Sequence, residues 1–344
     1  MKILRWGLLV VLASLCVLVG MVGFLVTNRS TLPDFPALTN NSKGQVRMLF
    51  LGTSSMLWTD GKTNWMLDGF FSRQPVLDVM LTQIDVLRPR VDETAQKAFE
   101  ILKVPPVLAA VFVAHSHYDH SMDAPYLAKQ YGGQVMGSGS TQQIALGQGL
   151  DKSRTHLLTE GTPEQLGDFE IQAIRSAHAP TGFTGGFNTK PLTLPAHALA
   201  FKEGVSYMFV VKHKSQPDGV LAIIQPSAGF IPGQTKGIQT DTVFLGVGGL
   251  GKLKESQIEA YWQELVIQPK AKQVYLIHWD DFTQPLLQGA SPTPLQPMPK
   301  AMDNFEKSAA VLKRLAQQGG VNLFLLQNFQ QLSLVPTRGS APPI

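Results

Sequence analysis

The residues best suited to chemistry lie in one short segment, "VFVAHSHYDHSMD", residues 111 to 123. The apolar run of residues 107 to 114 predicts a strand buried on both faces. It is followed by His115, His117, Asp119 and His120. Imidazoles suit Zn, Fe or Mn, and a nearby carboxylate can bind a second ion or orient a water molecule. The segment therefore predicts a metal site at the carboxyl edge of a sheet, where α/β proteins place their ligands.

The elements around this segment predict one α/β domain over residues 45 to 335. Two apolar-rich strands flank Asp60-Gly61, a dipeptide typical of hairpin turns. Residues 91 to 104 predict a helix with Asp92 as its N-cap, and a second helix should begin at Asp123. Further strands are expected in "FEIQAIRSA", "VSYMFVVKH", "GVLAIIQ", "DTVFLGVGG" and "KQVYLIH", and helices in "SQIEAYWQELVI" and "MDNFEKSAAVLKRLAQQG". The mixture favours two mixed sheets packed together with helices outside.

The "HSHYDH" segment resembles the H-x-H-x-D-H signature of the metallo-β-lactamase-fold hydrolase superfamily. Other motifs of that family can be matched in order: "IQAIRSAHAP" supplies His178 after a later strand, and "VYLIHWDDF" supplies His278 near the end of the domain. The opening hairpin is also similar, and its second strand ends in Asp68. The resemblance spans residues 45 to 335 and implies an αββα sandwich with its metals along one edge. The opening hairpin and the "HSHYDHSMD" turn are most similar to the branch that contains lactonases acting on sugar phosphates and phospholipases cleaving N-acylphosphatidylethanolamines.

The resemblance also implies how the ligands divide between two ions. By position, the first ion would be held by His115, His117 and His178, and the second by Asp119, His120 and His278. The expected cofactor is one or two Zn²⁺ ions, with Mn or Fe as alternatives. Such an ion lowers the pKa of a bound water from about 15.7 towards 7, so that hydroxide forms at neutral pH.

One departure from the family pattern concerns the residue that bridges the two ions. The family usually has an aspartate after the strand between the third and last histidines, commonly in a Gly-Asp pair. Here the strand "GVLAIIQ" is followed by Ser227 and Ala228, and neither is an anionic bridge. Asp280 and Asp281, just past the last histidine, are candidates to replace it. We therefore expect the site to hold one metal tightly and the second weakly, or one alone, unless another carboxylate serves as the bridge.

Two residues are candidates for a direct catalytic role. Asp119 can orient a metal-bound water, and His197 follows the glycine-rich loop "TGFTGGFNTK" and could reach the substrate as a hydrogen-bond donor.

The first thirty residues differ from the rest. Lys2 and Arg5 precede residues 6 to 26, which contain no charge. Twenty-one residues at about 1.5 Å each just span a hydrocarbon core of roughly 30 Å. The positive flank precedes the span, so we expect an inner-membrane signal anchor with the domain on the periplasmic, extracytoplasmic side. A cleaved signal peptide is the alternative. Residues 31 to 44 are expected to be a linker and residues 336 to 344 a loose tail.

Composition narrows the function further. The net charge of +4 comes from scattered basic residues, so nucleic-acid binding is not expected, and a nuclease of the same fold is disfavoured. Cys16 is the only cysteine, so the chain has no intrachain disulfide and no thiolate metal site. The expected function is a membrane-anchored metal-dependent hydrolase of a phosphodiester, ester or lactone, acting on a small molecule or a lipid. A non-catalytic, metal-containing binding module of the envelope and a β-lactamase-like amidohydrolase are the alternatives.

Overall fold

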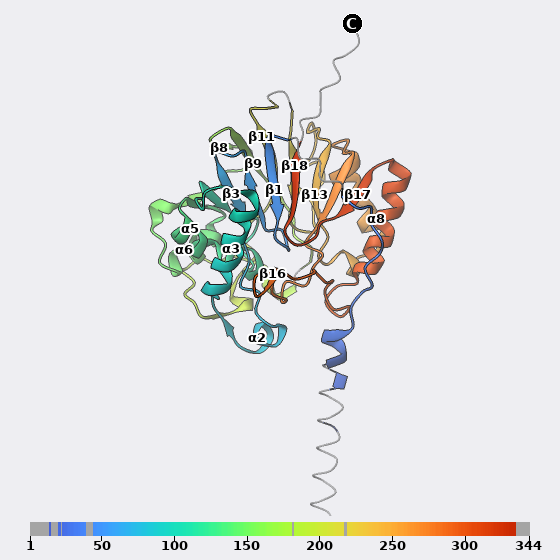
Figure 1. Ribbon diagram of the computed structural model, residues 1–344. Helices are drawn as coiled ribbons and strands as arrows, with labels where there is room; N and C mark the ends of the chain where they lie inside the picture. Colours follow the sequence, from blue (N-terminus) through green and yellow to red (C-terminus); the bar gives the residue numbers. More distant parts are fainter. Residues whose placement is uncertain are drawn as a thin grey trace, which may run out of the picture.

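Two seven-stranded sheets packed face to face form the centre of the molecule (Figure 1). The computed structural model describes residues 14, 20–21, 23–38, 44–180, 182–216 and 219–334. The first sheet has the order β18 (Gln330–Leu334), β1 (Val46–Phe50), β2 (Met56–Thr59), β3 (Asn64–Leu67), β5 (Ala110–Phe112), β6 (Gln134–Gly137), β7 (Thr155–Leu157). The second has the order β17 (Asn322–Leu325), β14 (Gln273–Ile277), β13 (Thr242–Gly246), β12 (Ala222–Gln225), β11 (Ser206–His213), β9 (Phe169–Ser176), β8 (Pro163–Leu166).

Helices cover the outer faces of both sheets, which gives the four-layer αββα arrangement (Figure 1). The first sheet is covered by α3 (Arg88–Leu102), α5 (Ala124–Tyr131) and α6 (Gly139–Gly147), and the second by α7 (Glu255–Trp262) and α8 (Phe305–Gly319). A π-helical turn, Gln263–Ile267, continues α7. The short helices α2 (Val76–Leu81) and α4 (Tyr118–Ser121) and the small two-stranded sheets β4 (Gln83–Ile84) with β10 (Ala196–His197) and β15 (Leu287–Gln288) with β16 (Ser291–Pro292) complete the described fold.

Aromatic side chains join the two sheets across the core. Trp58 and Trp65, neighbours on β2 and β3, stack with ring centroids 5.2 Å apart. From the first sheet, Trp58 contacts Phe244 at 5.6 Å and Phe112 contacts Phe209 at 5.7 Å, both edge-on. Such pairs add to the hydrophobic burial and fix the relative position of the sheets. These contacts hold the two sheets together beneath the edge at which β5, β9 and β14 end.

Most of the elements expected from the sequence are present. The strands β2 and β3 pair around Asp60-Gly61 as predicted, and the five later strands and both late helices form. The first predicted helix begins earlier, at Arg88, because Pro89 is accommodated in its first turn. The prediction of Asp92 as its N-cap is wrong, since this carboxylate accepts a hydrogen bond from the Tyr126 hydroxyl at 2.7 Å.

The chain before β1 lies against the domain. Lys300 donates its backbone N–H to the carbonyl of Asn28 at 2.7 Å, Lys313 donates to the carbonyl of Asp34 at 2.8 Å, and Phe35 packs against the core. Among the described residues, no helix is both long and apolar enough to cross a bilayer. Most of the predicted span of residues 6 to 26, and the predicted tail of residues 336 to 344, lie outside the described residues.

Candidate metal centre

Six side chains that could bind metal meet at one edge of the sandwich, where strands of both sheets end. After β5 the chain passes through His115 and His117 into α4, which carries Asp119 and His120. On the second sheet, β9 leads to His178 and β14 leads to His278. The carboxyl ends of these strands meet at the same edge, which is why residues up to 163 positions apart in sequence converge.

The first cluster consists of His115, His117 and His178. One ring nitrogen of each lies within 4.8 Å of the others, and the ring centroids are 4.4–4.8 Å apart. The ring of His115 is fully buried, and neither of its nitrogens has a hydrogen-bond partner among the described residues. A buried imidazole without any partner is costly. A metal ion bound by these three rings would remove that cost, so the residues fit the ion that the sequence motif implies.

The electrostatics of the first cluster keep its imidazoles neutral, the form that binds metal. Burial and the nearby histidines hold the pKa of His115 well below its usual range. Burial likewise lowers the pKa of His117 to about 4 and that of His178 to about 3. The Nδ1 of His178 lies 2.6 Å from the carbonyl of Ala179, and this contact orients the ring with Nε2 free for an ion. At neutral pH all three rings are ready to bind a cation without losing a proton.

The second cluster consists of Asp119, His120 and His278. Oδ2 of Asp119 lies 3.4 Å from Nε2 of both histidines, and these two nitrogens are 3.1 Å apart. Although burial alone would raise the pKa of Asp119, His120 and His278 hold it well below its usual range. The ring centroid of His120 is 3.8 Å from that of His115, so the two clusters form one continuous centre.

Asp68, at the end of the opening hairpin, supports the second cluster from behind. Its carboxylate is fully buried, lies 2.8 Å from Nδ1 of His120, and accepts hydrogen bonds from the Ala114 backbone N–H and the Ser54 hydroxyl. This fixes the ring of His120 so that Nε2 faces His278. Although burial alone would lower the pKa of His120, the carboxylates of Asp68 and Asp119 raise it to about 10.

Strained backbone surrounds the second cluster. His278, Thr53 and Asp68 all have left-handed φ values, of 53°, 54° and 56°. Non-glycine residues rarely adopt this conformation, and it persists only where the surroundings enforce it. Here the backbone N–H of His278 donates to the carbonyl of Thr53 at 2.6 Å, which ties the last ligand to the opening hairpin.

The two carboxylates proposed as a replacement bridge do not serve as one. Asp280 is fully buried in an ion pair with Arg73, at 2.9 Å, and also accepts a hydrogen bond from the backbone N–H of Thr53. Asp281 pairs with Arg29 at 2.6 Å. Neither belongs to the ligand clusters, because arginines on other segments already neutralise them. At the position of the family's bridge stands Ser227, whose buried hydroxyl has no partner among the described residues.

The structure gives His197 a different place from the one predicted. The pairing of β10 with β4 directs Ala196 inward and His197 outward. The ring of His197 is exposed, and its Nδ1 lies 3.2 Å from the carbonyl of Thr82. His197 is not among the residues that line the pocket, although Ala198 and Leu199 are. The geometry therefore does not support His197 as a hydrogen-bond donor to the substrate.

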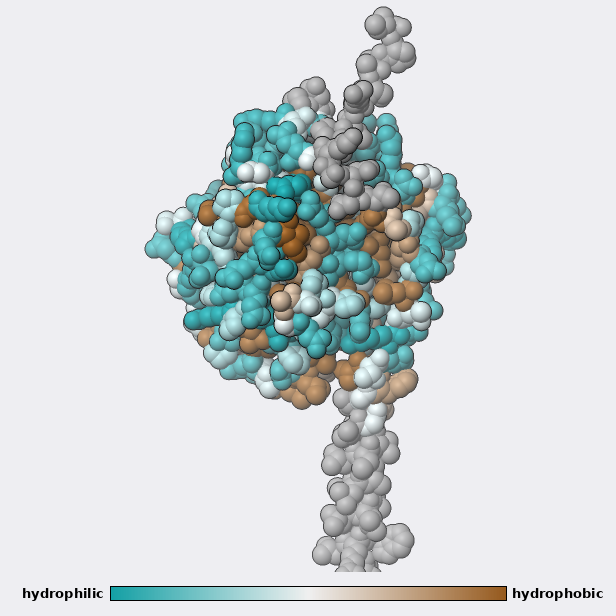
Figure 2. All heavy atoms as spheres, viewed as in Figure 1, coloured by the Kyte–Doolittle hydropathy of each residue, from teal (hydrophilic) through white to brown (hydrophobic). Residues whose placement is uncertain are grey.

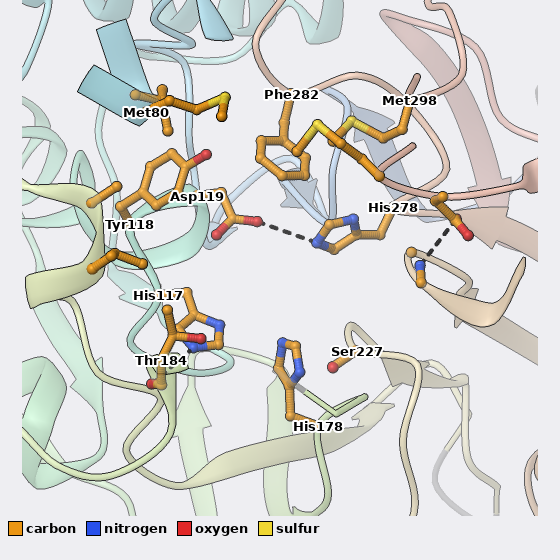
Figure 3. A pocket seen from close by; sticks show the side chains of 17 residues that line it. Met80, His117, Tyr118, Asp119, His178, Thr184, Ser227, His278, Phe282 and Met298 are labelled. Atoms are coloured by element: carbon orange, nitrogen blue, oxygen red, sulfur yellow. Dashed lines mark hydrogen bonds and ion pairs between the residues drawn. The ribbon is translucent and has the colours of Figure 1, made fainter. Parts of the chain in front are cut away.

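A pocket of about 560 Å³ opens over both clusters (Figure 3). His117, Asp119, His178 and His278 reach into it, and the Ser227 hydroxyl points towards the histidines in the same view. Much of the remaining wall is apolar and was not foreseen from the sequence, because it comes from segments far apart in the chain: Val79, Met80, Leu199, Phe282, Met298 and Met302. The arrangement can hold a cation beside an ionised carboxylate in a pocket whose wall is largely apolar.

A third group of possible ligands, Asp60, Asp168 and His213, lies at the other end of β9 and β11. Nδ1 of His213 is 2.8 Å from the Ser215 hydroxyl, and Nε2 is 3.3 Å from Asp60. Asp168 is paired with Lys214 at 2.6 Å. The polar atoms of these three residues thus already have hydrogen-bond or ion-pair partners, so the group does not indicate a second metal site.

Comparison with known proteins shows similarity in structure. No family model matches this chain, and no curated protein does. Among solved structures, Igni18, a metallo hydrolase from Ignicoccus hospitalis, is 10% identical with a TM-score of 0.50 and covers 83% of this chain and 97% of its own. A possible metal-dependent hydrolase from Veillonella parvula is 12% identical with a TM-score of 0.50 and covers 84% of this chain and 99% of its own.

The metallo-β-lactamase fold protein YhfI from Bacillus subtilis is 14% identical with a TM-score of 0.46 and covers 83% of this chain and 98% of its own. At such identities the likeness concerns the fold. The αββα layers and the ligand clusters at one sheet edge agree with it. The chain thus shares the fold of the two metal-dependent hydrolases, and its layers fit the metallo-β-lactamase sandwich that the "HSHYDH" motif led us to expect.

Proposed function

We propose that this protein is a membrane-anchored, extracytoplasmic, metal-dependent hydrolase of a phosphodiester, carboxylic ester or lactone. The observation that carries the proposal is the His115, His117 and His178 cluster: the fully buried His115 imidazole has no partner among the described residues, and His117 and His178 line an open pocket. The names of the similar structures, metal-dependent hydrolases, support the same reaction class.

The chain's own groups divide the work as follows. His115, His117 and His178 would hold the first ion, and Asp119, His120 and His278 the second. When bound, the ion supplies Lewis-acid activation of water and of the scissile bond. The ionised Asp119 carboxylate lines the pocket and can orient a water molecule there by accepting a hydrogen bond. The unpaired Ser227 hydroxyl can donate a hydrogen bond to an oxygen of the substrate.

Ligand chemistry supports zinc and unequal binding of two ions. Five imidazoles and one carboxylate form a donor set that zinc accepts readily, and Mn or Fe are alternatives for a carboxylate-containing second site. Since Ser227 stands where the family has an anionic bridge, the second cluster has one negative ligand fewer to stabilise its ion. We infer tight binding at the first cluster and weaker binding at the second.

Membrane anchoring rests on the sequence and on where the N-terminal segment meets the domain. Residues 6 to 26 contain no charge and follow Lys2 and Arg5. Asn28 and Arg29, just beyond this stretch, are bonded to the domain at Pro297 and Lys300. The domain would therefore stay close to the surface in which the segment is held.

The test is metal content and hydrolysis by the full chain in detergent micelles. Zinc-loaded protein should cleave at least one of bis(p-nitrophenyl) phosphate, p-nitrophenyl butyrate and a γ-lactone, and His117→Ala should lose that activity together with about one metal per chain. His156→Ala is the matched control, because His156 is a histidine outside the centre, paired with Glu164 at 2.8 Å.

Two outcomes would reject the enzyme. Bound metal without turnover of any probe would favour the non-catalytic binding module, in which the ion only stabilises the fold. Absence of bound metal after incubation with zinc or manganese would reject the metal centre itself. Hydrolysis of nitrocefin with weak turnover of the other probes would instead favour the β-lactamase-like alternative.

A further inference from the structure

The six-residue helix α2, "VLDVML", exposes apolar side chains instead of burying them. None of its residues is buried, and five of the six are apolar; Asp78 is the exception. The side chains of Met80 and Leu81 are 68% and 72% exposed, and Leu77 is also exposed. Single exposed apolar residues are common, but a short helix with several of them forms a patch that usually marks a binding surface.

This apolar surface continues around the mouth of the pocket. Met80 lines the pocket from α2, and the exposed residues Leu199 and Met302 line it from two other segments. We call the set of Leu77, Met80, Leu81, Leu199 and Met302 the apolar rim. Any surface that covers the apolar rim therefore also covers the entrance to the metal centre.

The N-terminal segment reaches the domain beside the apolar rim. Arg29 forms a β-bridge with Pro299, and its guanidinium donates to the carbonyl of Pro297 at 2.6 Å. The pocket residues Met298 and Met302 belong to the same short stretch. In Figure 1 the helical residues 23–27 leave the domain at the same end as α2, and Figure 2 shows apolar residues gathered at this end.

The length and the position of the uncharged residues 6 to 26 indicate which surface covers the apolar rim. Residues 6 to 26 are long enough to cross a hydrocarbon core, and only two residues separate their end from Arg29, which is fixed on the domain. The domain cannot then move far from the bilayer surface, and the apolar rim lies on the side where the segment emerges. A second copy of the chain would have to compete for the apolar rim with a bilayer that the N-terminal segment already holds close to it.

We propose that the apolar rim docks into the surface of the bilayer that holds the N-terminal segment, so that the pocket opens towards the lipid and takes an amphipathic substrate from it. The scissile group of this substrate lies at the metal centre, while its hydrocarbon chain passes between Met80, Leu199 and Met302. This inference rests on the proposed hydrolase function and names the substrate class of the same site.

Docking is tested by fluorescence of the full chain in phosphatidylcholine–phosphatidylglycerol vesicles. Cys16 is replaced by serine, and a solvatochromic dye is attached through Leu81→Cys or, as control at the far end of the sandwich, Lys214→Cys. The dye at position 81 should shift to the blue and be quenched by brominated acyl chains, and the dye at position 214 should do neither. Equal responses at the two positions, or a blue shift that depends on protein concentration in detergent micelles, would overturn docking on a bilayer.

Substrate delivery is tested with a variant that carries both Leu77→Gln and Leu81→Gln. The two leucines are exposed and do not line the pocket. Turnover of p-nitrophenyl palmitate, or of a hexadecyl p-nitrophenyl phosphodiester, in vesicles should fall at least fivefold, while turnover of the matching water-soluble probe should stay unchanged. The control variant is Val107→Gln, at an exposed apolar residue just before β5, at the other end of that strand from the centre.

The outcomes separate the two proposals. Turnover of water-soluble probes combined with equal vesicle rates for the test and control variants would overturn the delivery of substrate from the bilayer and leave the hydrolase intact. Loss of turnover on all probes in the unsubstituted protein would reject the hydrolase function itself.

Discussion

Between pH 6 and pH 8, the affinity of this protein for a second zinc ion should rise by about tenfold for each pH unit relative to its affinity for the first. The reason is that a metal ligand must be deprotonated, so an ion competes with any proton that its site holds. Low pKa values of His117 and His178, about 4 and 3, leave the first cluster free of protons in this range. In the second cluster, the pKa of His120 is raised to about 10, so its ring carries a proton that the ion must displace.

The size of the effect follows from the pKa of His120. A pH of 7 is about three units below that pKa, and each unit corresponds to about 1.4 kcal/mol of free energy. Displacing the proton therefore costs the second ion about 4 kcal/mol. This is an upper limit, because the charge of an ion in the first cluster, with His115 and His120 rings 3.8 Å apart, lowers the pKa of His120.

Calorimetric titration with zinc in two buffers of different ionisation enthalpy gives the number of protons released by each equivalent. Apart from any proton lost by metal-associated water, we expect the first cluster to release almost none and the second cluster about one at pH 7. Asp68→Asn removes a buried carboxylate 2.8 Å from His120, so it should reduce the second value and flatten the pH dependence. Equal proton release by both equivalents, or an unchanged second value in Asp68→Asn, would refute this explanation of the unequal clusters.

Three further outcomes are expected. The metal-free protein should lose stability as the pH falls from about 6.5 towards 4, by up to about 1.4 kcal/mol per pH unit for each of His117 and His178. The reason is that folding lowers the pKa of both rings, so the unfolded chain binds protons first. Urea unfolding at several pH values measures this loss. Asp280→Ala should lower the free energy of unfolding by about 3–5 kcal/mol, since it leaves the fully buried Arg73 without its partner, and an effect below about 1 kcal/mol would contradict that account. His197→Gln should keep kcat/KM within about twofold for any probe that is hydrolysed, because this exposed ring does not line the pocket; a tenfold loss would restore it as a catalytic candidate.

The sequence indicated which side chains converge at the sheet edge because these candidate ligands follow apolar strands in a recognisable order. His115 to His120 come directly after β5, and His178 and His278 each follow a strand, so local patterns locate all six candidate ligands. The strand pattern likewise predicted both sheets. Local patterns are sufficient here because a strand end fixes where the next side chains go.

Contacts between distant segments could not be predicted in this way. Nothing near Asp280 in sequence indicates that Arg73, on the first half of the chain, neutralises it. Asp92 looked like an N-cap, but a tertiary contact with Tyr126 takes its carboxylate, and the helix begins before it. The pocket wall formed by α2 and the segment around Met298 depends on the folded arrangement for the same reason.

The bonds of the N-terminal segment also impose an order on folding. Arg29 and its partner Pro297 are 268 residues apart, and β1 finds its edge partner β18 only at Leu334. Synthesis proceeds from the N-terminus, so Arg29 and one edge of the first sheet must wait for nearly the whole chain to be made. The entrance to the metal centre is thus among the last parts of the molecule to close, and a nascent chain lacking its final fifth would leave the edge of β1 open to wrong partners.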